Sequence, residues 1–197
     1  MSKSDPASQK KERHKTIRWV VTIFLVTICV SATISLISEE VMEGSGTLVA
    51  CLILLAIIFV GIIFDIIGVA VTSADEKPFN SMAARKVPGA REAIRLLRNA
   101  ERVSSICNDV VGDICGVVSG AASATIAARV LTNFTFSWPR MITLITSSLV
   151  AGLTVGGKAV GKTFAIRSST KIVHTVGKVI CFFRTLPGRF VKKKTKR

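Results

Sequence analysis

The chain combines 197 residues, 49% of them hydrophobic, with a formal charge of +15, a pairing that is unusual for a soluble protein. A basic nucleic-acid-binding domain would have the charge but not four long apolar segments, and a disordered basic tail would lack the Ile, Val and Leu. Apolar segments with basic flanks are the pattern that the positive-inside rule produces. The composition therefore predicts an integral membrane protein and no nucleic-acid partner.

The first two expected elements are a basic tail and an extra N-terminal span. Residues 1–16 are polar and basic, which predicts a disordered cytoplasmic tail. Residues 17–38 carry no charge after Arg18 and reach the length of about 20 residues that a transmembrane helix needs. A cleaved signal peptide, whose apolar core measures about 7–15 residues, is the alternative. We expect a retained span with Trp19 at its interface.

A second span follows after a short acidic connection. Residues 39–46 contain no Lys or Arg, which predicts that this connection lies outside the cell. Residues 47–73 then return across the membrane, interrupted by a single charge, Asp65.

The inner connection, residues 74–102, ends in a predicted amphipathic helix. Pro78 and Pro88 are expected to break any earlier helix. From Pro88 onward the apolar residues on one face are Ala93, Leu96, Leu97 and Ala100. The arginines lying largely on the other face are Arg91, Arg95, Arg98 and Arg102. We expect this helix to lie at the cytoplasmic interface, with anionic lipid headgroups as its partner.

The third span, residues 103–131, carries polar groups where a span should be apolar. Asn108, Asp109 and Asp113 fall within its first three turns. A carboxylate inside the membrane is costly, so it usually faces a partner, an ion or a water-filled cavity. Asp109 and Asp113 are four residues apart and share a helix face. Glycines that recur every four residues, which favour close helix approach, are Gly112, Gly116 and Gly120.

The rest of the chain contains an outer turn, a fourth span and a basic end. Phe136 and Trp138 are expected to anchor the outer turn at the interface. Residues 141–166 form the fourth span, which Lys158 and Lys162 interrupt.

A second amphipathic helix is predicted for residues 168–186, before a basic cytoplasmic tail at residues 187–197. The predicted fold class is thus an all-α integral membrane protein of the cell membrane. It has four transmembrane helices and interfacial amphipathic helices in the lipid bilayer. An even number of spans with basic termini predicts that both termini are cytoplasmic.

The charges inside the spans fall at a similar depth. Counting from the inner ends of the spans at 1.5 Å per residue places Asp65, Asp109, Asp113 and Lys158 roughly 9–15 Å from the cytoplasmic face. Two explanations stay open. The carboxylates with Asn108 bind a hard divalent cation such as Mg²⁺, or Lys158 pairs with the aspartates and locks the bundle.

Three segments together resemble the transmembrane domain of the CNNM/CorC family, linked to magnesium and cobalt transport. The family's F-S-G-x-E-T-A-L-T-S is similar to residues 64–73, FDIIGVAVTS. Its G-N-x-x-x-N is similar to residues 108–113, NDVVGD, and its G-E-x-x-P-K to residues 157–162, GKAVGK. The chain departs from these motifs at Gly68 and Lys158, where the family has Glu, and at Gly161, where it has Pro.

The resemblance implies a CNNM/CorC-like domain at residues 47–186, with three core helices and a juxtamembrane helix, and a homodimer. Its cation would be held by Asp65, Asp109 and Asp113, with Asn108 added from the chemistry above. The regulatory CBS domains of the family are not expected in this chain.

The expected function is ion transport or efflux of a divalent cation, magnesium or cobalt, through the acidic site inside the membrane. The alternative is a non-transporting scaffold or accessory subunit, in which Lys158 and the aspartates form a structural ion network. A holin-like membrane protein is a third possibility. An enzyme is not expected, because His14 and His174 are the only histidines and no Ser-His or Cys-His arrangement is evident.

Overall fold

The computed structural model describes residues 6–133 and 138–192, and every regular element within them is a helix. In chain order the elements are α1 (Pro6–Glu43), α2 (Thr47–Ser73), α3 (Lys77–Ala84), α4 (Ala90–Arg98), α5 (Ala100–Ser105), the π-helix η1 (Ile106–Gly112), α6 (Asp113–Asn133), α7 (Pro139–Arg167) and α8 (Ser169–Lys192). Parts of the predicted tails, residues 1–5 and 193–197, and the predicted anchor Phe136 lie outside the described residues.

Four helices are long and apolar enough to cross a membrane, which confirms the four predicted apolar helices. Their candidate spans are Ile17–Met42, Thr47–Ser73, Ala100–Thr132 and Arg140–Arg167. The second has the predicted boundaries, and the third begins three residues earlier than predicted because α5, η1 and α6 form one continuous helix. Insertion into a membrane and the orientation of the termini stay predictions.

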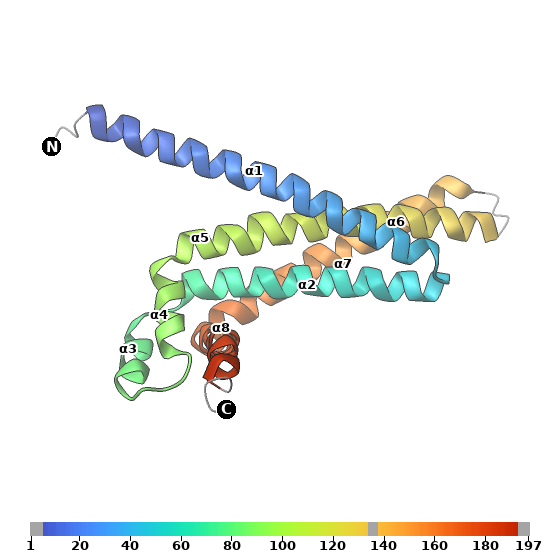
Figure 1. Cartoon of the computed structure of the whole chain (residues 1–197). Coiled ribbons are helices and arrows are strands. Elements are labelled where there is room, and N and C mark those ends of the chain that lie inside the picture. The colour runs from blue at the N-terminus through green and yellow to red at the C-terminus, as the bar shows by residue number, and fades with distance from the viewer. Residues whose placement is uncertain (1–5, 134–137, 193–197) are drawn as a thin grey trace.

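Helix α2 is the centre of the bundle. It contacts α5, η1, α6 and α7, and α6 and α7 also contact each other (Figure 1). Toward the end of the bundle that bears the α1–α2 connection, the core includes Leu54, Ile58, Ala122, Ile126 and Val150. A second core near the opposite end includes Val71, Phe79, Ala93, Ala165 and Val173. The three central spans therefore bury their small and branched side chains against one another.

Helix α1 differs from the prediction at its start. It begins at Pro6, so most of the residues expected to form a disordered tail are helical. Proline is well accommodated at a helix start, where its missing N–H group has no intrahelical partner to lose. No Gly or Pro interrupts the chain from there to Gly44, so the helix continues. Its N-terminal part diverges from the bundle (Figure 1).

The inner connection contains a helix where a break was expected. Pro78 lies in the first turn of α3, and this position explains why the expectation was wrong, because a proline there removes no helical hydrogen bond. The predicted amphipathic helix is present as α4, with Ala93 buried and its arginines exposed. It ends at Arg98, and α5, which begins at Ala100, leads directly into η1.

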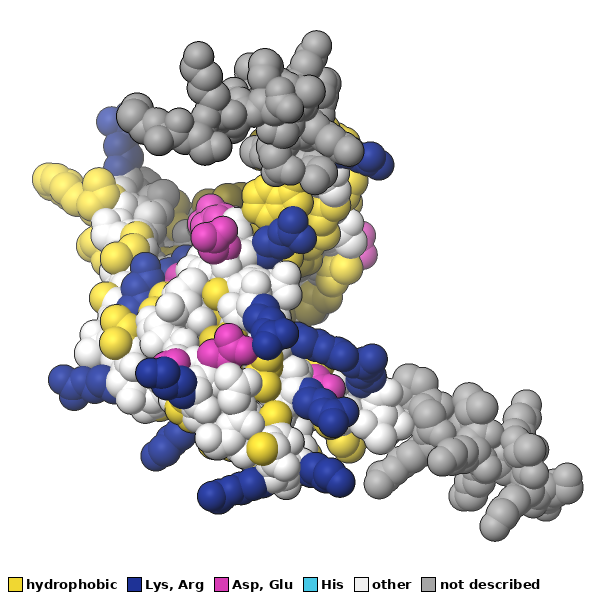
Figure 2. Space-filling model, turned by 90° about the vertical axis from the view of Figure 1, so that its left-hand side faces the viewer, with side chains coloured by type: hydrophobic (Ala, Val, Ile, Leu, Met, Phe, Trp, Pro, Cys, Tyr) yellow, Lys and Arg dark blue, Asp and Glu magenta, His cyan; other side chains and the backbone are white. Residues whose placement is uncertain are grey.

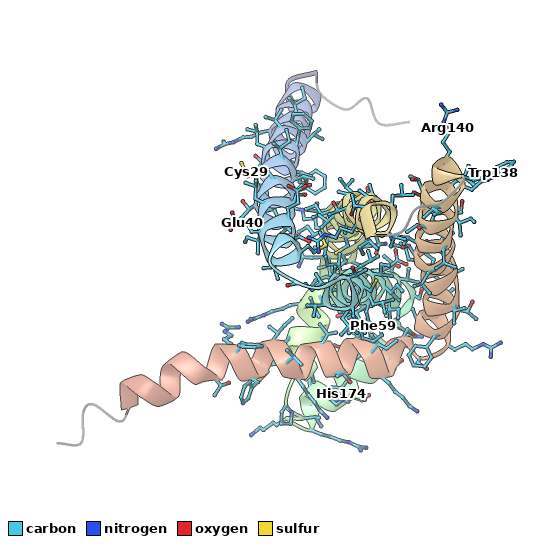
Figure 3. All side chains as sticks on the ribbon, turned by 90° about the vertical axis from the view of Figure 1, so that its right-hand side faces the viewer. Cys29, Glu40, Phe59, Trp138, Arg140 and His174 are labelled. Carbon is cyan, nitrogen blue, oxygen red and sulfur yellow. The ribbon has the colours of Figure 1, made fainter. Side chains whose placement is uncertain are left out.

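Helix α8 lies across one end of the bundle. In Figure 3, α2 and α6 are seen nearly end-on while α8 runs across the view. It extends beyond residue 186, the predicted end of this helix, as far as Lys192. With α3 and α4 it forms what we call the basic end of the bundle. Figure 2 faces this end and shows Lys and Arg side chains projecting around it.

Candidate functional site

The third span contains a π-helical segment at the position of its polar residues. Segment η1 covers Ile106–Gly112 and includes Asn108 and Asp109. A π turn holds more residues than an α turn, and such segments often occur at functional sites. The sequence prediction of a uniform helix gave no indication of it.

Asn108 packs directly against α2 at Gly68. A Cβ atom added at Gly68 would lie 2.2 Å from Asn108 Oδ1, so only glycine leaves room for the carboxamide. Asn108 Nδ2 donates a hydrogen bond to Ser104 Oγ at 3.2 Å. Its Oδ1 is buried and has no hydrogen-bond partner among the described residues. The carboxamide is thus held at the α2–η1 interface with its oxygen free.

Asp65 is buried on the same face of α2. It lies three residues before Gly68, which places the two on neighbouring positions of one helix face. Asp65 is 4% exposed, and its Oδ2 is buried without a hydrogen-bond partner in the described part of the chain. Among the residues whose side chains the structure describes, no Lys or Arg nitrogen lies within 4.0 Å of this carboxylate. Burying an unpaired carboxylate is costly, and buried charges in proteins are usually paired with an opposite charge or a metal ion.

Lys158 approaches η1 from α7 but reaches a carbonyl group. Its Nζ donates to the backbone oxygen of Gly112 at 3.5 Å, at the long limit of a hydrogen bond. The ion pairs found between described residues do not include Lys158, so the predicted pairing with the aspartates is not seen there. Lys158 is half-buried and borders the interface that holds Asn108.

Two glycines set the distance between α7 and α2. A Cβ atom at Gly157 would lie 2.4 Å from Ile62 Cδ1, and one at Gly161 would lie 2.8 Å from Ile66 Cγ1. Small residues of this kind let helix backbones approach closely inside a membrane. The contact positions Lys158, which follows Gly157 directly, next to the end of η1.

Asp109 and Asp113 lie on the exposed side of the third span. Asp109 accepts a hydrogen bond from Ser105 Oγ at 2.7 Å, and both aspartates are exposed. The described residues contain no group of three or more His, Cys, Asp or Glu side chains that could hold a metal ion. Counting residues gave the depth of each carboxylate but not its direction around the helix axis. The structure thus brings Asp65 and Asn108 to one interface and leaves the other two outside it.

We call Asp65, with its buried carboxylate, Asn108, with its buried Oδ1, and Gly68 the Asp65–Asn108 site. The sequence indicated Gly68 only as a departure from the family motif, because only the packing of η1 shows that its lack of a side chain is needed. It could have indicated Ser104, which lies one helical turn before Asn108. Carboxylate and carboxamide oxygens are ligands that hard divalent cations accept. A cation is therefore the partner that this pair fits chemically.

Comparisons with protein-family models, with curated proteins and with solved structures each gave no match. The resemblance to the CNNM/CorC family accordingly rests on the motifs of the sequence alone.

Proposed function

We propose that this chain is a multi-pass membrane protein that transports a divalent cation, Mg²⁺ in the first instance, with the Asp65–Asn108 site holding the ion during passage. The observation that supports this proposal is the buried Asp65 carboxylate, whose Oδ2 has no partner among the described residues. A buried carboxylate is stabilised by a nearby cation. Asn108 Oδ1, buried and equally unpartnered in the described chain, supplies a second oxygen.

The proposed ion, Mg²⁺, follows from the resemblance of three segments to motifs of magnesium and cobalt transporters. Asp65 and Asn108 stand in two of the three segments that resemble CNNM/CorC motifs. Lys158 stands in the third and contacts the carbonyl of Gly112 at the end of η1. The three segments that resemble the family thus meet around one interface, which supports a common role.

Segment η1 is the element that we propose to move. A shift from π to α bonding changes the register by one residue, which rotates the side chains beyond it by about 100°. Such a rotation would withdraw the Asn108 oxygen from Gly68 and change which face of the membrane the site is open to.

The exposed aspartates support the proposed homodimer. Asp109 and Asp113 would face lipid in a single chain, which is costly inside a membrane. Cβ atoms added at Gly116 and Gly120 would meet nothing within 4 Å, so this side of α6 has room for another helix. A second copy covering this side would remove the aspartates from lipid. We place the basic end and both termini in the cytoplasm of the cell by the positive-inside rule.

The proposal is tested by thermal unfolding of the purified protein in a neutral detergent against Mg²⁺. A cation that binds only the folded state stabilises it by about 2.7 kcal/mol at 100 times its Kd. We expect this response in the wild type and its loss in Asp65→Asn. The matched control is Asp109→Asn, which removes the same charge from an exposed position in the adjacent helix and should keep the response.

Flux is measured next, in liposomes that contain a magnesium-sensitive dye. We expect uptake with the wild type and Asp109→Asn, and none with Asp65→Asn. A magnesium response that survives Asp65→Asn would refute the site. If Mg²⁺ has no effect and Lys158→Met destabilises the protein, the scaffold alternative replaces transport.

A further inference from the structure

A cavity opens at the basic end, between the α3–α4 connection and α8. Its volume is about 320 Å³, and its lining includes Lys86, Val87, Pro88, Arg91 and Cys181. The first four belong to the α3–α4 connection and the start of α4, and Cys181 comes from α8. The cavity therefore depends on the docking of α8 against α4.

Close backbone contacts hold these walls together. Gly89, with φ of 84°, adopts a left-handed conformation that favours glycine, and its added Cβ would lie 2.6 Å from the backbone nitrogen of Lys178. A Cβ at Gly177 would lie 2.5 Å from the oxygen of Gly89. His174 Nε2 lies 3.3 Å from the carbonyl oxygen of Pro88. These contacts fix the position of α8 against α4 and thereby the shape of the cavity.

The cavity lining is positively charged. Lys86 and Arg91 contribute two cations, and both are exposed. Glu92 also lines the cavity, with its Oε1 3.9 Å from Arg184 Nη1, and Lys86 and Arg91 together outweigh its single negative charge. The remaining named lining residues, Val87, Pro88 and Cys181, are apolar. An anion with an apolar portion matches this combination.

The position of α8 indicates where such an anion comes from. The helix runs across the axes of α2 and α6 (Figure 3), so it lies parallel to the plane of a membrane that those helices cross. Next to Cys181, its exposed apolar residues are Val179, Ile180, Phe182 and Phe183. Exposed phenylalanines beside lysines and arginines are typical of a helix at the boundary between acyl chains and headgroups. The cavity therefore opens in the headgroup layer.

We propose that this cavity binds the phosphate group of an anionic phospholipid. Lys86 and Arg91 neutralise the headgroup, and the acyl chains lie along the exposed apolar residues of α8. Free phosphate shares the charge of the ligand but would leave this apolar surface unused. A zwitterionic lipid carries the same phosphate, yet its own cation offsets the charge that Lys86 and Arg91 recognise. The proposal is independent of cation transport.

The test measures protection of Cys181. The purified full chain in a neutral detergent is alkylated with a maleimide, and the rate at Cys181 is followed by peptide mass spectrometry. Short-chain phosphatidylglycerol, phosphatidylcholine and inorganic phosphate are compared as probes. At about three times Kd, an occupied cavity leaves about one quarter of the protein free, so alkylation should slow about fourfold. We expect this slowing with phosphatidylglycerol only.

Two double variants separate the site from general surface charge. Lys86→Gln/Arg91→Gln removes both cations of the lining and should abolish protection. Arg85→Gln/Arg95→Gln removes the same charge from exposed neighbours that do not line the cavity, and should keep it. Alkylation without lipid, together with circular dichroism, shows whether each variant is folded.

Each remaining outcome overturns the proposal. Equal protection by phosphatidylcholine would mean that any amphiphile covers Cys181. Equal protection by inorganic phosphate would mean that the cavity binds a free anion rather than a lipid. Loss of protection in Arg85→Gln/Arg95→Gln would mean that the lipid is attracted by the overall positive charge of the surface rather than by the cavity. Should the Lys86/Arg91 variant fail to fold, native mass spectrometry of the wild type from mixed micelles decides, since the proposal requires preferential retention of phosphatidylglycerol.

Discussion

Replacing Gly68 by alanine directly tests the packing of the Asn108 side chain against α2. The added methyl group would lie 2.2 Å from Asn108 Oδ1 and 2.9 Å from its Cγ, far inside contact distance. The carboxamide must therefore move, or α2 and η1 must separate. Gly152→Ala is the matched control, because a Cβ there meets nothing within 4 Å. Both positions lie inside predicted transmembrane helices.

The expected magnitude follows from two opposing effects. Alanine is favoured over glycine inside a helix by about 1 kcal/mol, and this gain applies to both variants. Overpacking costs about 1–3 kcal/mol and applies only to Gly68→Ala. The two variants should therefore differ by about 1–3 kcal/mol, which is about 2–12 °C in Tm at about 2–4 °C per kcal/mol for a chain of this size.

A double-mutant cycle identifies the cause of the difference. Asn108→Ala removes the carboxamide that the new methyl group would meet, so Gly68→Ala should cost less in that background. We expect a coupling of about 0.5–3 kcal/mol from thermal unfolding of the four proteins. The reasoning fails if Gly68→Ala is as harmless as Gly152→Ala, or if its cost is the same with and without Asn108.

Two further predictions concern other contacts of the fold. Gly177→Ala should weaken the packing of α8 against α4, because its Cβ would lie 2.5 Å from the oxygen of Gly89. We expect faster proteolysis of α8 in this variant. An unchanged rate of proteolysis would contradict the close contact. Arg129 donates to the backbone oxygen of Met42 at the end of α1 and to that of Ser45 in the α1–α2 connection. Arg129→Gln should lower the free energy of unfolding by about 1.5–3 kcal/mol, measured by thermal unfolding. The control, Arg140→Gln at an exposed position, should change it little. Equal losses in the two variants would argue against a stabilising role for the Arg129 hydrogen bonds.

Much of the fold was predictable because membrane helices obey strong local rules. The span at 47–73 was predicted with its observed boundaries, since an apolar helix in lipid must satisfy its backbone internally and be long enough to cross. The extension of α1 to Pro6 and the helix around Pro78 were not predicted. Both depend on where a proline falls relative to a helix start, and composition alone does not decide that.

The sequence by itself determined which polar residues interrupt the apolar segments and how far each lies from the end of its segment. The presence of Asp65, Asn108, Asp109 and Asp113 in apolar segments follows from counting along the chain. Only the tertiary structure decided which of them have buried polar atoms at α2 and which are exposed. Segment η1 changes the angular position of every side chain beyond it, and Gly68 accepts Asn108 because two helices pack at that point. Direction around a helix depends on backbone bonding and on the neighbouring helix, so no residue count could separate the buried pair from the two exposed aspartates.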